Sequence, residues 1–404
     1  MKVAHLCTSA LSHKILVDKL ALLRKKGYDI HLVSSEEGYD PNLVDKYGFE
    51  LRFVHMNRPI KPLDDLRSIF RVAKVLKQEQ YDIVHTHTAK AGVVGRIAAR
   101  LARVPVVIHT THGLPFYEGQ SRLKNRLFCL LEKIGAAFGH AIASQNREDI
   151  AKIREYAPRA TVYYEGNGVD LEALDAKRAA VTPEMLSELR RQWSIRPDQK
   201  VMLMGARFEP VKDHFFLLEG LKRLKQLGQT DYVCVLAGKG ELEDEVRSRI
   251  KEYGLEEQVR LIGHTREIYS WIELADVIVL SSEKEGIPRI VMEAMTYSKP
   301  VVASDVIGTR ETVTNERNGL LVPYKDADAL ASALNKVLGD GEYASRLGQE
   351  GRRMVEQEFT EELVVERIHA YYGELIKKLG LTEKAKHLQS VTVDTGYAEG
   401  SNSV

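Results

Sequence analysis

Two glutamates stand eight residues apart in the segment EGIPRIVME, residues 285–293, directly after the apolar run ADVIVLSS. Pro288, between them, suits the first turn of a helix. The spacing therefore predicts Glu285 on a loop and Glu293 inside the helix, with unpaired backbone N–H groups between them. A helix N-terminus of this kind binds anions readily. The alternative is that one acid complements the helix dipole and the other is solvated.

A second motif, GARFEPVK, brings two cations, Arg207 and Lys212, to the end of the apolar run VMLMGAR. Two cations there could neutralise a diphosphate and stabilise it as a leaving group in place of a divalent metal. Two basic residues in a loop are usually only solvated, so their significance depends on convergence with the segment 285–293. A third motif, the turn AGKGE, lacks the third glycine of a dinucleotide fingerprint and disfavours an NAD-dependent enzyme.

Histidines follow two apolar runs in the first half of the chain. His109 and His112 end VPVVIHTTH, and His85 and His87 end DIVHTH. A histidine facing a ligand could hydrogen-bond a hydroxyl group or a developing charge. A single histidine is more often structural, and that alternative applies to all four.

Neither a metal site nor nucleic-acid binding is predicted. The one Asp-x-Asp pair, Asp326 and Asp328, opens a helical pattern and is better explained as an N-cap with an acidic first turn. The basic residues are not interleaved with an aromatic platform. The three cysteines have no metal-ligand spacing, and their odd number argues against a disulfide framework and for a reducing compartment.

The elements that must position these motifs are short apolar runs alternating with helical patterns. Such alternation predicts parallel sheets with helices on both faces, and ligands gather at the carboxyl ends of their strands. The rhythm restarts in the second half, which predicts two α/β domains. The runs are KVAHLCT, DIHLVS, LRFVHM, DIVHTH, VPVVIHTT and HAIASQ, then VMLMGAR, DYVCVLAG, QVRLIGH, ADVIVLSS, PVVASD and GLLVP.

The predicted domain limits follow from composition. The 404 residues exceed what one core usually serves. The polar stretch 171–200 is the natural boundary, so we predict a first domain over 1–180 and a second over 195–360. A helix over 361–380 follows, and a polar tail occupies 381–404.

Charge is divided unevenly between the two halves. Residues 1–160 carry 26 Lys and Arg against 16 acidic residues, a net +10, and the remainder carries 32 against 41, a net −9. The basic half suits an anionic membrane surface or, equally, attraction between the domains. The start is too short for a signal peptide and no run is long enough to span a membrane, which predicts a cytoplasmic protein, peripheral on the inner face of the membrane if it docks there.

Taken together and in this order, the motifs resemble family four of the retaining glycosyltransferases over residues 1–379. NGVD, residues 167–170, completes the set, and the two spaced glutamates are the signature of that family. The resemblance implies the GT-B fold, an α/β architecture of two Rossmann-like domains with parallel sheets facing a central cleft. It implies transfer from a nucleotide diphosphate sugar, with UDP the preferred nucleotide, without a cofactor or metal. The first domain would bind the acceptor, a lipid-linked or small glycan, and the second the donor.

The same resemblance implies a role for each matching residue. Arg207 and Lys212 would hold the diphosphate, and Glu293 would bond the ribose hydroxyls. Glu285 and His112 would be the catalytic residues. Glu285 would contact hydroxyls of the donor sugar or support the developing oxocarbenium charge, and His112 would touch the transferred sugar. The backbone N–H groups of Gly286 and Ile287 would meet the diphosphate. The acceptor side would involve Ser9, His13 and Lys14, in a loop where many relatives carry a Gly-rich sequence and this chain has TSALSH.

Two further segments favour a partner at the membrane. HTHTAKAGVVGRIAAR and IHTTHGLPFYEG resemble bacterial enzymes that build capsule or exopolysaccharide units on a polyprenyl diphosphate carrier. The basic segment 121–135, with helical apolar spacing, fits docking on an anionic membrane or, alternatively, packing in the core. Two other functions stay open: a nucleotide-sugar epimerase of the same architecture, which needs no acceptor, and a catalytically silent nucleotide-sugar binding protein.

Overall fold

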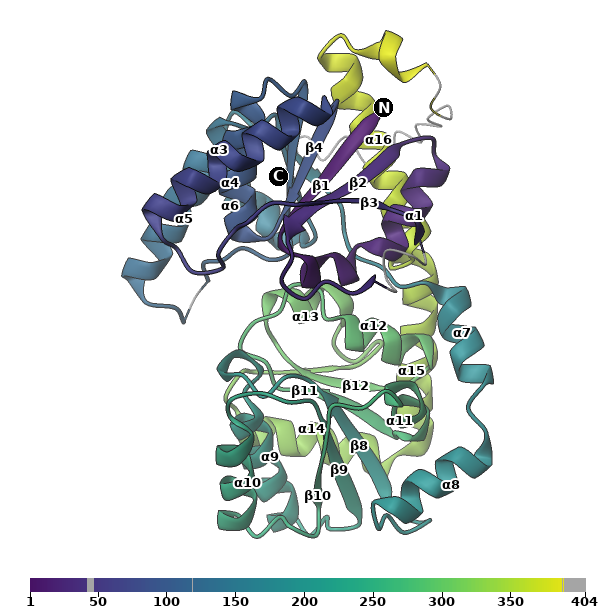
Figure 1. The fold of residues 1–404 in the computed structure, drawn as a ribbon. Helices are drawn as coiled ribbons and strands as arrows, with labels where there is room; N and C mark the ends of the chain where they lie inside the picture. Colours follow the sequence, from purple (N-terminus) through teal and green to yellow (C-terminus); the bar gives the residue numbers. More distant parts are fainter. Residues whose placement is uncertain (42–46, 118, 387, 389–404) are drawn as a thin grey trace, which may run out of the picture. The chain divides into compact units, whose positions relative to one another are not determined.

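The computed structural model of the chain describes residues 1–41, 47–117, 119–386 and 388. The chain divides into two compact units, each with its own sheet (Figure 1). The first unit comprises Met1–Gly166 together with the chain from Glu361 onward, and the second comprises Asn167–Thr360. Each unit is described by itself below.

The first unit contains a fully parallel seven-stranded sheet in the order β3-β2-β1-β4-β5-β6-β7. Successive residues of its strands alternate between two covered faces. Val3 and Cys7 face the core formed with α1 and α16, while Ala4 and Leu6 face the core formed with α3 and α4. The strands are β1 (Lys2–Ser9), β2 (Asp29–Ser35), β3 (Glu50–Phe53), β4 (Ile83–His87), β5 (Val106–Thr111), β6 (Ala141–Ser144) and β7 (Thr161–Tyr164).

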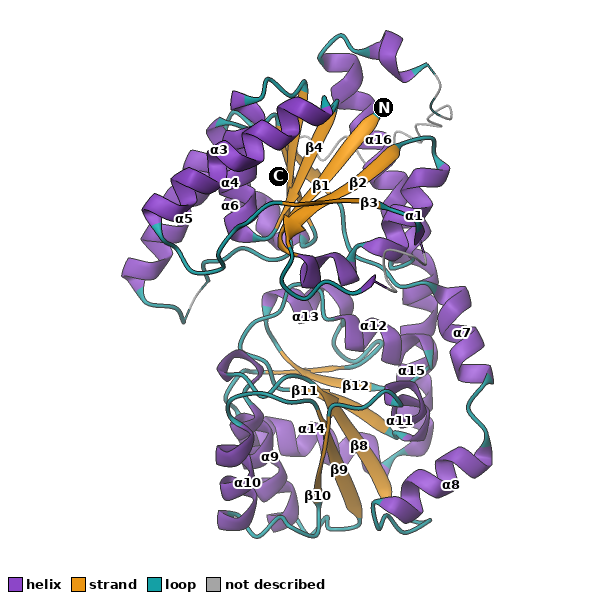
Figure 2. Ribbon diagram, in the orientation of Figure 1, coloured by secondary structure: helices purple, strands orange, loops and turns teal. Residues whose placement is uncertain are grey.

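Helices cover both faces of this sheet (Figure 2). The last long helix, α16 (Glu361–Lys378), packs against α1 and buries Val364, Ile368 and Tyr372 in the core of the first unit. The other helices are η1 (Ala10–Ile15), α1 (Val17–Lys25), α3 (Pro62–Glu79), α4 (Ala89–Leu101), α5 (Arg122–Ala137), α6 (Arg147–Tyr156) and η3 (Thr382–Ala385).

The second unit repeats the architecture with a parallel six-stranded sheet in the order β10-β9-β8-β11-β12-β13. Met202 and Met204 pack with α9 and α14 on one face, and Val201 and Leu203 pack with α11 and α12 on the other. The strands are β8 (Lys200–Gly205), β9 (Tyr232–Ala237), β10 (Val259–Gly263), β11 (Val277–Leu280), β12 (Val301–Ser304) and β13 (Leu320–Val322).

Its helices include two that lie in the stretch predicted as the domain boundary, α7 (Leu171–Ala179) and α8 (Pro183–Gln192), and the core of the second unit contains Leu174 and Leu189 from them. The others are η2 (Pro210–Lys212), α9 (His214–Gln226), α10 (Glu243–Glu252), α11 (Ile268–Leu274), α12 (Arg289–Thr296), α13 (Ile307–Thr312), α14 (Ala327–Gly339) and α15 (Gly341–Glu358). The polar tail predicted from residue 381 lies, from 389 onward, outside the described residues.

The prediction of two parallel, Rossmann-like α/β sheets is confirmed. All twelve predicted runs form strands, and β7, with the sequence TVYY, is an additional one. In each sheet the strand order reverses beside the first strand, between β1 and β4 and between β8 and β11. Ligands bind at such switch points in open α/β sheets. Among the described helices none is long and apolar enough to cross a membrane.

Candidate functional site

Two predicted residues meet at the switch point of the second unit. Lys212 follows β8 and Glu285 follows β11, and the Lys212 Nζ lies 2.6 Å from the Glu285 Oε1. The Glu285 side chain is 8% exposed and the Lys212 side chain 21%, so this ion pair lies at the edge of the unit's interior. Ser282 donates a second hydrogen bond, of 2.6 Å, to the same carboxylate oxygen. The carboxylate is therefore held in one orientation by two donors.

The loops that carry this pair are fastened to each other. The Ser281 hydroxyl donates to the backbone carbonyls of Lys212 and Asp213, at 3.1 and 2.9 Å. The backbone N–H of Glu283 donates to the carbonyl of Val211 at 2.9 Å. Asp213, at φ +41°, accepts from the N–H of Phe216 and so caps α9. These contacts fix Lys212 without using its ammonium group.

Gly308 brings the start of α13 against the loop that carries Glu285. A Cβ placed on Gly308 would lie 1.7 Å from the carbonyl oxygen of Gly286 and 2.7 Å from the Glu285 Cβ, so only glycine fits this approach. Among the described residues, no backbone carbonyl accepts from the N–H groups of Gly286 or Ile287. Ile287 itself is buried in the core, which anchors the loop just before α12.

The AGKGE turn positions the other cationic loop. A Cβ on Gly238 would lie 2.0 Å from the Ala206 carbonyl oxygen, and one on Gly240 would lie 2.3 Å from that of Phe208. The two glycines therefore let this turn pack directly on the loop after β8. Arg207 on that loop is 71% exposed and pairs with Glu209, so it does not join the Lys212–Glu285 pair.

Glu293 lies on α12, which begins at Arg289 with Pro288 as its N-cap. The Glu293 Oε1 accepts from Arg289 Nε at 3.1 Å and from the Tyr269 hydroxyl at 3.3 Å. Glu293 is buried, with 8% of its surface exposed. The two glutamates thus belong to the same segment but bond to different partners, and Glu293 is not a solvated surface acid.

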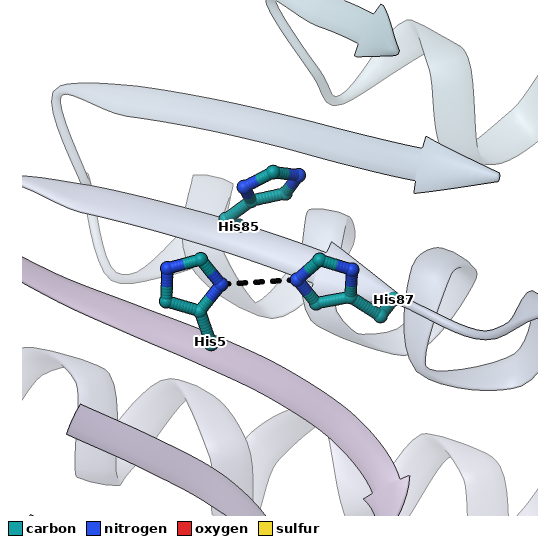
Figure 3. A group of neighbouring side chains, drawn as sticks. All are labelled: His5, His85 and His87. Atoms are coloured by element: carbon teal, nitrogen blue, oxygen red, sulfur yellow. Dashed lines mark hydrogen bonds between the residues drawn. The ribbon is translucent and has the colours of Figure 1, made fainter. Parts of the chain in front are cut away.

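His112 belongs to a network in the first unit. His5, His85 and His87 lie on neighbouring strands β1 and β4, on the sheet face covered by α1 and α16 (Figure 3). The His5 Nδ1 lies 3.0 Å from the His87 Nε2, and the His87 Nδ1 lies 3.1 Å from the His112 Nε2. The His87 ring stacks with those of His5 and His85, with centroids 5.3 and 4.4 Å apart.

A buried carboxylate fixes the tautomer of His85. Glu165 accepts from the Lys19 ammonium, the Tyr371 hydroxyl and the Thr110 hydroxyl, at 3.0, 2.9 and 2.6 Å. Since the one hydroxyl hydrogen of Thr110 goes to Glu165, the His85 Nε2, 2.6 Å from Thr110, must donate. Burial alone would raise the pKa of Glu165, but the Lys19 charge, the hydrogen bond from Thr110 and the neighbouring His85 and His112 together lower that pKa to about 2.

The available donors and acceptors also indicate the direction of the hydrogen bonds from His5 through His87 to His112. The His5 Nε2 is buried and has no partner. If the His5 Nδ1 donates to His87, the His5 Nε2 carries no hydrogen and is only an acceptor without a donor. If His87 donates to His5 instead, the His5 Nε2 carries a buried N–H group without an acceptor, which is the rarer case in proteins. The first order leaves the His112 Nε2 accepting from His87, while His112 also bonds Gln145. A sugar hydroxyl could reach a ring nitrogen only by displacing one of these partners.

Burial keeps these histidines neutral. It lowers the pKa of His112 to about 4 and that of His85 to about 3, in both cases with the Lys19 charge adding to the effect. One ring nitrogen from each of His5, His85 and His87 falls within 4.8 Å of the others, a spacing that a metal ion could use. The nitrogens of His85 and His87 are already taken by hydrogen bonds, so the described residues form a hydrogen-bonded network here rather than an open ligand set.

The residues predicted for the acceptor side lie at the end of β1 and in η1, also in the first unit. Ser9 is buried and accepts from Arg58 at 3.3 Å. His13 is 2% exposed and lies against the backbone of Val33. Lys14 is exposed and pairs with Asp40 at 3.3 Å. Only Lys14 of the three is open to solvent.

Sequence reasoning missed Ser282, Gly308, Lys19 and Glu165. Ser282 stands three residues before Glu285, and Gly308 lies at the start of α13, after the predicted run PVVASD. Both therefore lie shortly after a strand end, where a polar or small residue is informative. Nothing in the sequence pairs Lys19 with Glu165, 146 residues away. The prediction for Asp326 holds: it caps α14 by accepting from the N–H of Ala329 at 2.9 Å.

Comparison with known proteins matches both units to families. Residues 187–354 match the family described as glycosyl transferases group 1, and residues 2–146 match glycosyl transferase 4-like. The chain is 30% identical to the Escherichia coli UDP-Gal:alpha-D-GlcNAc-diphosphoundecaprenol alpha-1,3-galactosyltransferase, over 84% of this chain and 88% of that enzyme. It is 26% identical to the capsular polysaccharide biosynthesis glycosyltransferase CapM of Staphylococcus aureus, over 93% and 98%.

Solved structures agree on the fold. Anabaena HepE, crystallised with UDP and glucose, superposes with a TM-score of 0.77 at 22% identity, covering 93% of this chain and all of that one. A glycosyltransferase from Rickettsia africae superposes with a TM-score of 0.76 at 21% identity, covering 93% and 98%. At these identities the likeness establishes the GT-B architecture.

Proposed function

The chain belongs to the glycosyl transferases group 1 family, and we propose that it moves a sugar from UDP to a lipid-linked glycan, with retention of configuration, in capsule or exopolysaccharide assembly. That it is a nucleotide-sugar glycosyltransferase follows from the family. The observation that carries the finer proposal is the Lys212–Glu285 pair, held by Ser282 at the switch point of the second unit.

This geometry suits a sugar diphosphate. An ammonium group has three donors, and Glu285 accepts one from Lys212, which leaves donors for phosphate oxygens. The backbone N–H groups of Gly286 and Ile287 add neutral donors next to the pair. Positive charge and N–H groups fixed before the reaction stabilise the negative charge that grows on the leaving diphosphate. Glu285 is then free to meet a hydroxyl of the donor sugar.

In the proposed reaction, the bond between the anomeric carbon and the diphosphate oxygen breaks. The acceptor oxygen forms its bond to the same face of that carbon, and its proton passes to the leaving diphosphate. No separate general base is needed, which agrees with a site built from Lys212, Glu285 and N–H groups. The histidines of the first unit are neutral and serve as hydrogen-bonding groups.

The uridine base and the lipid-linked acceptor are supported by similarity. The Escherichia coli relative is named for transfer from UDP-Gal to a GlcNAc-diphosphoundecaprenol, and the Staphylococcus aureus relative for capsule synthesis. Both matches span most of this chain and most of the relative, so they cover the acceptor-side unit as well as the donor-side unit.

The test is direct transfer. The purified protein is incubated with UDP-Gal, UDP-Glc or UDP-GlcNAc, each with a synthetic GlcNAc-diphospholipid, in EDTA or in Mg²⁺. We expect one donor to give a glycolipid product in both buffers, with the anomeric configuration of the donor by NMR. Product of inverted configuration, or transfer that only Mg²⁺ supports, would contradict the proposal.

Two variants test the site within the same assay. Lys212→Met and Glu285→Gln should each lower turnover by about 10²-fold or more, the effect of removing one preorganised electrostatic group. The matched control is Lys336→Met, which breaks the exposed Lys336–Glu316 pair of 3.0 Å in the same unit and should leave turnover unchanged. Sugar interconversion without acceptor would instead identify an epimerase, and UDP-sugar binding without any turnover a binding protein.

A further inference from the structure

Helix α5 has its apolar stripe on the outside. Leu123 is 80% exposed, Leu127 46% and Leu130 54%, and these positions fall on one side of the helix. The inward side carries an ion pair beside apolar residues, of which Cys129 and Ala136 pack against a small buried cluster. Glu132 is 3% exposed and accepts from the buried Arg96 at 2.8 Å, and Gly135 lies against the same guanidinium. The helix is therefore held to its unit by this ion pair and by limited apolar packing, while Leu123, Leu127 and Leu130 face outward.

Helix α3 shows a second stripe of the same kind. Leu63 is 75% exposed, Leu66 51% and Phe70 60%, with the spacing of one helix face. Val72 and Leu76, on the other side, are fully buried in the core and account for the packing of this helix. Single exposed apolar side chains are ordinary on a protein surface, but two helices of one unit that each expose an apolar stripe are unusual.

Basic residues dominate the exposed charge of these two helices. On α3 and α5 the acidic residues are buried or half-buried, and Asp64, whose side chain is 38% exposed, pairs with Arg67 at 3.3 Å. The exposed basic residues are Arg67, Arg71, Lys74 and Lys77 on α3 and Arg122, Lys124, Arg126 and Lys133 on α5.

Both stripes begin at the same edge of the sheet. The strands are parallel, α3 follows β3, and α5 follows β5, so the N-terminal turns of both helices lie at the carboxyl edge of the strands. Helix α4 contacts both of them (Figure 1). That edge is also where β1 ends at Ser9 and η1, which contains His13 and Lys14, begins.

We propose that these two stripes with their basic residues form a docking face for an anionic phospholipid bilayer. We call it the α3–α5 face, defined by Leu63, Leu66, Phe70, Leu123, Leu127 and Leu130. Apolar side chains enter the interfacial region while the surrounding Lys and Arg meet lipid phosphates, as in other amphipathic interfacial helices. A second copy of the chain is the poorer occupant, because a twofold contact would set basic residues against basic residues.

Docking on this face goes beyond sugar transfer, and its test needs no substrate. The full chain is sedimented with vesicles of phosphatidylcholine alone or with about one third phosphatidylglycerol, at about 0.05 and 0.5 M salt. We expect binding only to the vesicles containing phosphatidylglycerol, weakened by high salt. Equal binding to both compositions, or binding to neither, would overturn the proposal whether or not the protein transfers sugar.

Variants locate the face. Leu123→Ser with Leu127→Ser should weaken vesicle partitioning at least about tenfold, because each leucine contributes apolar burial. Lys124→Gln should weaken it roughly fivefold. Leu227→Ser, at a 61% exposed leucine of the second unit, is the matched control and should bind like the wild type.

Circular dichroism and thermal unfolding verify that each variant is folded. Wild-type binding by the folded α5 double variant would refute the assignment to this face. Light scattering supplies the other decisive outcome: a wild-type dimer that this double variant converts to monomer would show that a second copy covers the face.

Discussion

The substitution Gly308→Ala should perturb the geometry of the proposed donor site directly. A Cβ at this position would lie 1.7 Å from the carbonyl oxygen of Gly286, against the 3.0 Å that such contacts require. The obstacle is backbone, not a flexible side chain, so the loop with Glu285 or the start of α13 must move by about 1.3 Å.

A shift of that size is enough to break the pair. The Lys212–Glu285 distance of 2.6 Å would become about 3.9 Å if the displacement lay along it, beyond hydrogen-bond reach. Misplacement of a catalytic group by about 1 Å costs about 10²-fold in rate. Overpacking by one methyl group destabilises a fold by about 1–3 kcal/mol. The rate loss corresponds to about 2.7 kcal/mol, similar to the loss of stability. Because a domain is stable by about 5–15 kcal/mol, we expect transfer to fall about 10²-fold in a protein that stays folded.

The assay pairs kcat/KM for transfer with the free energy of unfolding in urea. Gly339→Ala is the control, since a Cβ there meets nothing within 4 Å and its backbone needs no left-handed conformation. It should keep full activity. Calorimetric titration of UDP into both variants reports whether the donor loop has moved, because the N–H groups of Gly286 and Ile287 move with it.

A Gly308→Ala protein with the turnover and UDP affinity of the wild type would refute the reasoning, since the loop would then tolerate the shift without effect on the site. If both the Gly308 and Gly339 variants lost activity to the same degree, helix substitution in general, and not close approach, would be the cause.

Three other predictions concern the interior and the helix caps. Lys19→Met should destabilise the protein by about 3–5 kcal/mol in urea, because it leaves the buried Glu165 carboxylate without its cation, and adding Glu165→Gln should recover most of that loss; no recovery would speak against charge burial as the cause. Burial lowers the pKa of His85 to about 3 and that of His13 to about 4, so unfolding takes up protons at acid pH. Stability should therefore rise with pH up to about 6.5 and level off, with a loss of about 2 kcal/mol per group at pH 5, and a flat profile in urea titrations would contradict it. Asp326→Ala should lower the free energy of unfolding by about 1 kcal/mol, because α14 loses its N-cap, and should leave transfer unchanged. Loss of transfer in this variant would show that Asp326 has a role in the reaction.

The sequence by itself determined the two sheets. Their strands are buried on both faces, so they read as continuous apolar runs, and the pattern identified twelve of them. It failed for β7, whose residues TVYY are all only half-buried. Residues at strand ends were equally readable, because a polar residue after a buried run marks the edge where ligands bind. Lys212 and Glu285 were found in this way.

Only the tertiary structure decided which residues meet. Lys212 and Glu285 are 73 residues apart, and it takes the adjacency of β8 and β11 to pair them, while Arg207 bonds Glu209 instead. The apolar spacing of α5 shows that the helix has two unlike sides but not which side faces inward. The Arg96–Glu132 ion pair settles that, because a buried charge must keep its partner and turns the leucines outward. Long-range charge pairing and close backbone approach depend on three-dimensional adjacency, which local patterns do not contain.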